Sequence, residues 1–464
     1  MRMAAGLASV TLLLLSGCAV GPDYLKPTAI VPAQYKEIKG WKFASPRDNA
    51  SRGEWWKAFG DAELNRLEAQ VAVSNQTLKA DEANYRQALA LIAEGRSQLF
   101  PTLNFDPSLT RSSGARTNLT AELAASWMPD IWGKIRRTIE SEGAAAQASA
   151  ADLASATLSA QSALALAYFQ VRQADSLHDL LTNTVDQYQR SLDIAQNQYN
   201  AGTNARSDVI TAQAQLLAAQ AQAINTGVAR AQNEHAIAVL MGRPPSGLSV
   251  AHATLTSRIP NIPVRLPSTL LERRPDIAAA ERVMEQQNAL IGVATAAYYP
   301  DVTLSGLFGY SGNPFIKQLA GANPVWSFGI SAAQTVFNGG LTSAQVEAAR
   351  ETYMASVATY RQTVLTAFQQ VEDQLAAIRI LSQQAAVQAK ATAAAEQAVQ
   401  IALNEYRAGT QNYTTVVTAQ ATALSDEEQA LTTRAQRMAA AVNLIVALGG
   451  GWTRDALPTL ASLQ

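Results

Sequence analysis

The chain has 464 residues, of which 48% are hydrophobic and 16% are charged, and its formal net charge at pH 7 is -1. Such a chain can bury a large core, and its balanced charge gives no field that favours nucleic acid, so no nucleic-acid partner is expected. One cysteine and three histidines exclude a disulfide within the chain and leave little material for a Cys/His metal site, so no metal is expected either.

Residues 1–17 have the pattern of a signal peptide: a short basic start precedes an apolar run over 4–15 that is too short to span a bilayer. The sequence LSGCA at 15–19 resembles a bacterial lipobox. That resemblance implies a mature lipoprotein that begins at Cys18 and carries diacylglycerol and palmitoyl lipid there. Ala19 resembles the pattern that sorts lipoproteins to the outer membrane. The alternative is an ordinary signal peptide with an accidental cysteine.

Residues 18–61 contain many prolines, polar residues and aromatics, and we expect an N-terminal arm and equatorial segment in which Trp55 and Trp56 anchor the arm in a groove. Residues 62–99 keep apolar side chains at steps of three and four, which predicts a helix that stops before Pro101.

The pattern then changes to period two. Apolar and polar residues alternate on both sides of a polar loop at 111–118, which predicts a β-hairpin over about 102–128. Its strands have the 9 to 11 residues that a tilted membrane strand needs, and Trp127 stands where an aromatic at the membrane interface would lie. No apolar run after residue 18 has the length of a membrane helix, so a mature chain that crosses a membrane must use strands.

Two helices follow the hairpin. The region 134–200 has no proline and is rich in alanine, glutamine, leucine and serine, which predicts one helix about 100 Å long. A returning helix is expected over 206–241. Helices of this length need partners in a coiled-coil-like layer. Residues 243–268 are a second irregular, proline-containing equatorial segment.

The same order of elements then repeats, so that residues 62–242 and 269–448 form two internal repeats. The second repeat has a helix that opens at Pro275 and runs to Tyr299, a hairpin at about 301–336, a long helix at about 340–407 and a returning helix at about 413–448. A C-terminal equatorial tail covers 449–464. In the second hairpin, further aromatics are expected at the membrane interface: Phe308, Tyr310 and Trp326.

The duplication is clearest at the turns between the long and returning helices. The stretches IAQNQYNAGTNARSDVITAQA (194–214) and IALNEYRAGTQNYTTVVTAQA (401–421) are two versions of one helix–turn–helix sequence. Gly202 and Gly409 supply the permissive backbone that a tight turn after a helix requires.

Four membrane-length strands cannot close a barrel by themselves, and an open sheet edge is not tolerated in lipid, so the chain must oligomerise. Three copies would give 12 strands and four copies 16, and either number encloses an aqueous pore. The long helices continue from the strands, so the same symmetry predicts a duct.

Over nearly its whole length the chain resembles the TolC-type outer-membrane factors, in the NodT-like lipoprotein branch. The matching stretches are LSGCAVGPDY, Trp55-Trp56, LLERRPDIAAAE at 270–281, AYYPDVTLSG at 297–306 and the two YxAGT turns. The resemblance implies an α+β membrane protein: a homotrimer with a 12-stranded transmembrane β-barrel, a 12-helix periplasmic α-barrel and an equatorial collar. It further implies a lipid-anchored protein of the bacterial outer membrane that extends into the periplasm, is no enzyme and needs no cofactor.

The resemblance implies as partners outer-membrane lipid, a periplasmic adaptor (membrane fusion protein) and an inner-membrane pump, commonly of the resistance-nodulation-division (RND) class. Passive efflux of small molecules such as drugs or toxic compounds, with a gate at the periplasmic helix tips, is the implied function. A duct for type I protein secretion is the first alternative. A lipid-anchored coiled-coil scaffold without a pore is the second.

Gate and adaptor contacts are expected at the tips. Family members often carry an aspartate and an arginine after the second turn, where this chain has Thr418 and Ala421, so Arg206 and Asp208 at the first tip could supply a charged gate instead. Solvated tip charges are the equal alternative, and Tyr199 and Tyr406 suit packing between helices better than gating. The expected tip residues are Tyr199, Gly202, Thr203, Arg206, Asp208, Tyr406, Gly409, Thr410, Tyr413 and Thr418.

Overall fold

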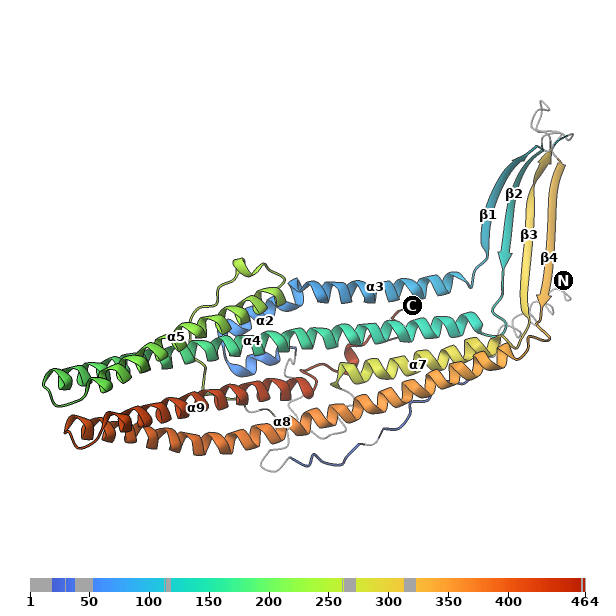
Figure 1. Ribbon diagram of the computed structural model, residues 1–464. Helices are drawn as coiled ribbons and strands as arrows, with labels where there is room; N and C mark the ends of the chain where they lie inside the picture. The colour runs from blue at the N-terminus through green and yellow to red at the C-terminus, as the bar shows by residue number, and fades with distance from the viewer. Residues whose placement is uncertain are drawn as a thin grey trace.

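The computed structural model describes residues 19–29, 31–37, 53–111, 113, 118–260, 262, 273–312, 323–459 and 462–463. These residues form an elongated molecule in which a layer of long helices continues into a four-stranded sheet at one end (Figure 1). Cys18 and parts of the segments expected at 18–61 and 243–268 lie outside the described residues.

Two helices of 67 residues run along most of the helical body: α4 spans Lys134–Asn200 and α8 spans Leu341–Arg407. At 1.5 Å per residue each is about 100 Å long. Each turns back into a helix of 35 residues, α5 (Arg206–Leu240) or α9 (Tyr413–Ala447). The pairs α4–α5 and α8–α9 pack lengthwise, and α4 also packs on α9. These bounds lie within one residue of those that the sequence predicts.

The single helix expected over 62–99 is wrong, because the structure has two helices there. α2 spans Ala62–Ser74 and α3 spans Gln76–Ser97. Asn75 between them has an extended backbone, its side-chain oxygen accepts hydrogen bonds from two amides of the next turn, and its side-chain nitrogen donates to the Leu240 carbonyl. An asparagine cap of this kind starts a new helix.

The corresponding helix of the second repeat, α7, spans Pro275–Ala296. It is 22 residues long, as α3 is. It ends three residues earlier than expected, and a turn through Tyr299 leads to Pro300 and the next strand. Short 3-10 helices complete the list of elements: η1 (Trp55–Phe59), η2 (Pro245–Gly247) and η5 (Arg454–Ala456).

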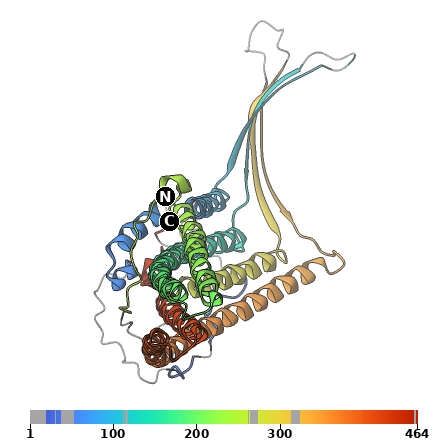
Figure 2. The ribbon, with the colours of Figure 1, turned by 60° about the vertical axis from the view of Figure 1, so that its left-hand side comes forward.

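The sheet is antiparallel throughout, with the order β1-β2-β3-β4. Its strands are β1 (Thr102–Thr110), β2 (Asn118–Trp127), β3 (Asp301–Gly312) and β4 (Asn323–Ala333). The two predicted hairpins therefore join through β2 and β3, so that both repeats contribute to one sheet. The sheet curves away from the helices, and β1 and β4 form its two edges (Figure 2).

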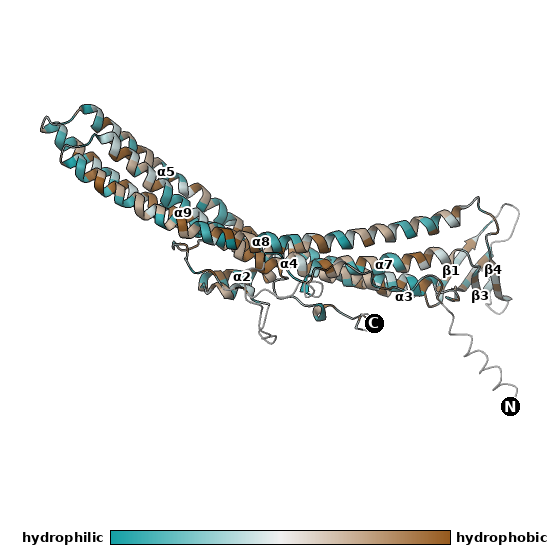
Figure 3. Cartoon of the chain, turned by 90° about the horizontal axis from the view of Figure 1, so that it is seen from below, coloured by the Kyte–Doolittle hydropathy of each residue, from teal (hydrophilic) through white to brown (hydrophobic). Residues whose placement is uncertain are grey.

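The main core lies where the arm, α2, the middle of α4 and α8 and the ends of α5 and α9 meet. Trp55 and Trp56 are buried there, and Trp55 Nε1 donates to Gln161 Oε1 at 3.3 Å, so the arm is anchored as expected. Further along, the long helices keep polar and apolar residues interspersed along their length (Figure 3). Among the described residues, no helix is both long and apolar enough to cross a membrane.

Candidate functional site

Both helix tips end in the same backbone motif. At the first tip the amide of Gly202 donates to the Tyr199 carbonyl and the amide of Thr203 to the Gln198 carbonyl. The same two hydrogen bonds recur at the second tip, and the central glycines have φ of +74° and +73°. This pattern is a Schellman motif, which satisfies the last carbonyls of a helix and needs a left-handed residue.

The threonines after the glycines reinforce these turns. The hydroxyls of Thr203 and Thr410 each donate to the same carbonyl that their own backbone amide already contacts, at 2.9 and 3.0 Å. The threonines that were expected at the tips therefore hold the turn itself.

A small core joins the two tips. Tyr406 and Tyr413 are 1% and 2% exposed, and their ring centroids lie 5.1 Å apart. Burial raises the pKa of both phenols, so both stay protonated and can donate a hydrogen bond. Around them pack apolar side chains from all four long helices: Ala195, Val209, Ala212, Ala402 and Val416.

One hydrogen bond in this core connects the repeats through a charge. Tyr406 Oη donates to Asp208 Oδ2 at 3.4 Å, a long distance for such a bond. Asp208 is therefore bound to a tyrosine of the other repeat. Arg206, two residues before Asp208, is exposed.

The two tip tyrosines occupy different environments. Tyr406 is buried, as expected for a packing residue, whereas Tyr199 is 41% exposed. Thr418 is exposed as well, and its hydroxyl donates to the Thr414 carbonyl of its own helix.

Four side-chain amides at the tips were not predicted. Gln198 Nε2 donates to the Tyr406 carbonyl at 3.2 Å, and Asn204 donates to Gln198 at 2.7 Å. Gln420 donates to Ser191 of the facing helix at 2.8 Å, and Gln215 accepts from Tyr413 at 3.4 Å. Only their position opposite the other repeat distinguishes these amides from the many solvated glutamines of these helices.

A groove of about 660 Å³ lies beside this core, between α4, α8 and α9. Its lining carries both signs of charge, from Arg190, Arg407, Glu396 and Glu427. Such a lining suits polar groups of either charge.

At the other end of the molecule the sheet has one apolar and one mostly polar face. Phe105, Leu123, Phe308 and Trp326 form one row across the four strands. All four are exposed in the single chain. Trp127 and Tyr310 share this face, nearer to its two ends, and Trp127 Nε1 donates to the Leu99 carbonyl at 2.9 Å.

On the opposite face, Asp106 of β1 pairs directly with Glu122 of β2. Serines, threonines, asparagines and glycines make up most of the remaining positions there. A sheet with an apolar and a polar face can separate lipid from water.

The residues that follow Cys18 are fixed where α4 meets the sheet. Arg137 is 4% exposed, and its guanidinium donates to the carbonyls of Val20 and Gly21 and to Asp23 at 2.8 Å. A Cβ at Gly133 would lie 2.6 Å from the Cα of Ala19.

No cluster of three metal-binding side chains occurs in the part of the chain that the structure describes. His178 contacts the Ala223 carbonyl and Thr226, whereas His252 contacts Asp175 and Asp179. These contacts hold helices and the equatorial segment together.

The model of the outer membrane efflux protein family matches residues 67–243 and 266–450, which is more than half of the chain, so the chain belongs to this family. It is an outer-membrane channel component of an efflux pump and not an enzyme. This assignment favours the efflux duct over the secretion and scaffold alternatives.

Relatives match along nearly the whole chain. The pyoverdine export outer membrane protein OpmQ of Pseudomonas aeruginosa is 30% identical over 96% of both chains. The toluene efflux pump outer membrane protein TtgC of Pseudomonas putida is 28% identical over 96% of this chain and 95% of its own.

Solved structures show the same fold. The outer-membrane channel OprN superposes with a TM-score of 0.86 at 29% identity, over 94% of this chain and all of its own. The CmeC channel of Campylobacter jejuni gives 0.87 at 21% identity, over 96% of this chain and 97% of its own. Long helices with four strands per chain are therefore a TolC-like fold.

Proposed function

We propose that three copies of this chain close into one duct, with a barrel of 12 strands, a helical tube and an equatorial collar. The sheet supports this proposal, because its edge strands β1 and β4 leave backbone groups unpaired that lipid cannot satisfy. Pairing β4 of one copy with β1 of the next removes every edge.

The outer helices of the layer support the same closure. α5 packs on α4, α4 on α9 and α9 on α8, so α5 and α8 lie at opposite edges. Each carries an exposed apolar stripe at steps of three, four or seven residues, as a coiled-coil seam does. The stripe of α5 consists of Ile210, Ala214, Leu217, Ala221, Ile224 and Val228. The stripe of α8 consists of Ile380, Val387, Ala394, Ala398 and Ile401.

The duct serves as the passive exit of a tripartite efflux pump for small molecules such as drugs or toxic compounds. A periplasmic adaptor and an RND-type inner-membrane pump are its partners. The observation that carries this function is the continuity of a two-faced, membrane-length sheet with helices about 100 Å long. Relatives named for toluene efflux and pyoverdine export support small, chemically diverse cargo.

Accumulation of a panel of dyes and antibiotics tests this function. Cells that lack the gene should accumulate several compounds more than cells that carry it, and complementation should restore export. Outer-membrane permeability must be matched between strains. Unchanged accumulation of every compound, in a strain without a redundant duct, would contradict the proposal.

The mature protein carries diacylglycerol and palmitoyl lipid on Cys18. The Arg137 contacts to residues 20–23 support this, because they hold the described start of the chain where α4 meets the sheet, at the membrane end of the proposed duct. The mass of the N-terminal peptide tests it: an unmodified cysteine or a different first residue would contradict lipidation.

The tips form the gate, and the Tyr406 to Asp208 hydrogen bond is one of its restraints. Tyr406→Phe removes only the hydroxyl, and a hydrogen bond to a charged group contributes about 1–2 kcal/mol, so the open population should rise roughly fivefold or more. Single-channel recording of the purified protein in planar bilayers measures this. Tyr413→Phe is the matched control, because its hydroxyl donates to a neutral amide and should matter less. Equal open probabilities for Tyr406→Phe and the unaltered protein would remove this bond from the gate.

A further inference from the structure

The turn between β4 and α8 presents two large apolar side chains to solvent. Val336 and Phe337 are 94% and 89% exposed, the highest values for large hydrophobic side chains in the described chain. The turn is held at both ends: Gln334 Nε2 donates to a carbonyl before β3 at 3.0 Å, and Asn338 Nδ2 donates to Thr342 at 2.7 Å. A fixed turn that exposes such residues indicates an interaction surface.

The internal repeat shows what a turn at this place contacts. The equivalent turn lies between β2 and α4, and the glycines that precede the two long helices, Gly133 and Gly340, have φ of +80° and +89°. Six residues before these glycines stand Trp127 and Gln334. Each donates a side-chain hydrogen bond to the carbonyl two residues before the proline that opens its own hairpin. The two turns are therefore structurally equivalent.

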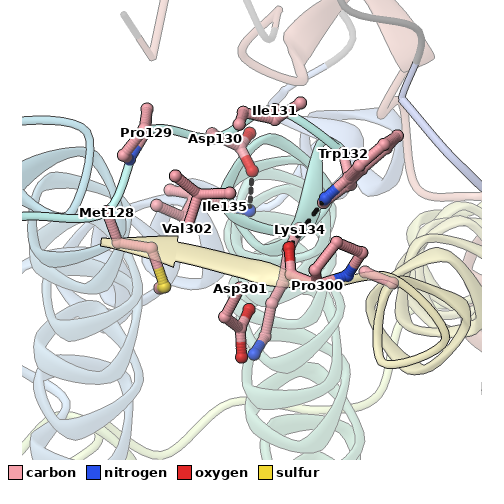
Figure 4. A pocket seen from close by; sticks show the side chains of 11 residues that line it. Met128, Pro129, Asp130, Ile131, Trp132, Lys134, Ile135, Pro300, Asp301 and Val302 are labelled. Carbon is pink, nitrogen blue, oxygen red and sulfur yellow. Dashed lines mark hydrogen bonds between the residues drawn. The ribbon is translucent and has the colours of Figure 1, made fainter. Parts of the chain in front are cut away.

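The first of these turns packs against the other repeat within the chain. Trp132 Nε1 donates to the Pro300 carbonyl at 2.9 Å, and its ring stacks on Tyr299 with the centroids 4.7 Å apart. Figure 4 shows the turn, with Trp132 directed at Pro300 where β3 begins. Gly133, next to Trp132, is buried and lies against Ala19.

Among the residues that the structure describes, the second turn has no such neighbour, because β4 is an edge strand. Gly340, the counterpart of Gly133, is exposed. At the opposite edge the connection from α3 to β1 is also uncovered: Ser97 and Pro101 are exposed, and Phe100, the counterpart of Tyr299, is 68% exposed. In the middle of the sheet, the turn after β2 packs on the residues before β3. At the two edges of the sheet, the turn after β4 and the residues before β1 are left without this contact in the described chain.

We propose that Val336 and Phe337 pack on Phe100 and Pro101 of a second copy of this chain, as a clasp at the base of the barrel. The inference rests on the proposed closure of β4 against β1 of the next copy. In that antiparallel pairing β4 ends and β1 begins at the helical end of the sheet, so the turn and Phe100 lie at the same level. The clasp buries the most exposed apolar side chains and covers Phe100, as Trp132 covers its counterpart Tyr299, although Phe337 stands two positions earlier in its turn than the Trp132 position.

Disulfide cross-linking tests the clasp. The variant Phe100→Cys with Phe337→Cys should form covalent oligomers under mild oxidation, because the two Cβ atoms would come near the roughly 4 Å that a disulfide requires. The two single variants are the controls, because they show whether an introduced cysteine forms a disulfide with the native Cys18. Oligomers of native size without a cross-link would overturn the clasp and leave the duct standing. A monomeric unaltered protein would instead contradict the proposed closure itself.

A second variant measures what the clasp contributes. Phe337→Asp should lower the ratio of trimer to monomer roughly tenfold or more on heating in detergent, because it places a charge against apolar carbon, while Phe337→Leu should have a small effect. Leu25→Asp is the matched control, since Leu25 is 81% exposed and lies on the arm. If Phe337→Asp left the ratio of trimer to monomer unchanged, the clasp would be contradicted. Val336 and Phe337 would then be side chains that contact lipid.

Discussion

Gly449→Ala is expected to destabilise the protein by roughly 3 kcal/mol or more, from two added costs. Gly449 has φ of +95°, where an L side chain is strained, and a Cβ there would lie 2.1 Å from the Arg273 carbonyl oxygen. That oxygen belongs to the backbone and cannot move aside cheaply. The same residue donates its amide to the Val446 carbonyl to end α9.

Gly409→Ala separates the two costs. Gly409 has φ of +73°, but nothing lies within 4 Å of its added Cβ, so only the backbone strain of about 1 kcal/mol remains. The midpoint of guanidinium unfolding, followed by circular dichroism of the purified protein, should fall clearly further for Gly449→Ala. Equal shifts for the two variants would show that the close approach to Arg273 costs nothing.

The elements were predictable because their signals are local. The long helices contain no proline, and the strands mostly alternate between apolar and polar residues, so one period dominates each element. The break at Asn75 was missed because α2 and α3 keep the same helical spacing on both sides of it. Its cause is a distant partner, the Leu240 carbonyl, which no local pattern reveals.

The environment of the tip residues was predictable only in part, for a physical reason. Tyr199 and Tyr406 stand in nearly identical sequences, and both turns form as the glycines predict. Tyr406 is buried against Tyr413 and Asp208, whereas Tyr199 is 41% exposed. Packing between repeats decides burial, and the local sequence does not encode it.

The second prediction with a large effect concerns Glu68: its replacement by glutamine is expected to raise the stability of the protein. Its side chain is fully buried on α2, and neither carboxylate oxygen has a hydrogen-bond partner among the residues that the structure describes. Burial raises its pKa from 4.5 to about 9, because an apolar environment disfavours the charged form. The folded protein therefore holds a proton on Glu68 at neutral pH that the unfolded chain releases.

The sign of the pH dependence follows from this raised pKa. Below pH 4.5 Glu68 is protonated in the folded and in the unfolded chain, so its titration does not change the free energy of unfolding. As the pH rises from 4.5 towards 9, the unfolded chain releases this proton and the folded protein loses stability. At pH 7 the loss is about 3 kcal/mol, at about 1.4 kcal/mol per pH unit. Glu68→Gln stays neutral in both states, so it should be more stable by about that amount at pH 7 and equally stable at pH 4.

Unfolding of both proteins by guanidinium, measured from pH 4 to pH 8, tests this expectation. Glu63→Gln is the matched control on the same helix. The hydrogen bond from Arg66 lowers the pKa of Glu63, so loss of the Glu63 charge should reduce the stability by a few tenths of a kcal/mol at pH 7. A stability difference between Glu68→Gln and the unaltered protein that does not grow with pH would show that Glu68 is not held protonated. If Glu68→Gln were instead less stable than the unaltered protein at pH 7, the Glu68 carboxylate would have to be charged and bound in the folded protein. The unpartnered oxygens of Glu68 in the described structure argue against that outcome.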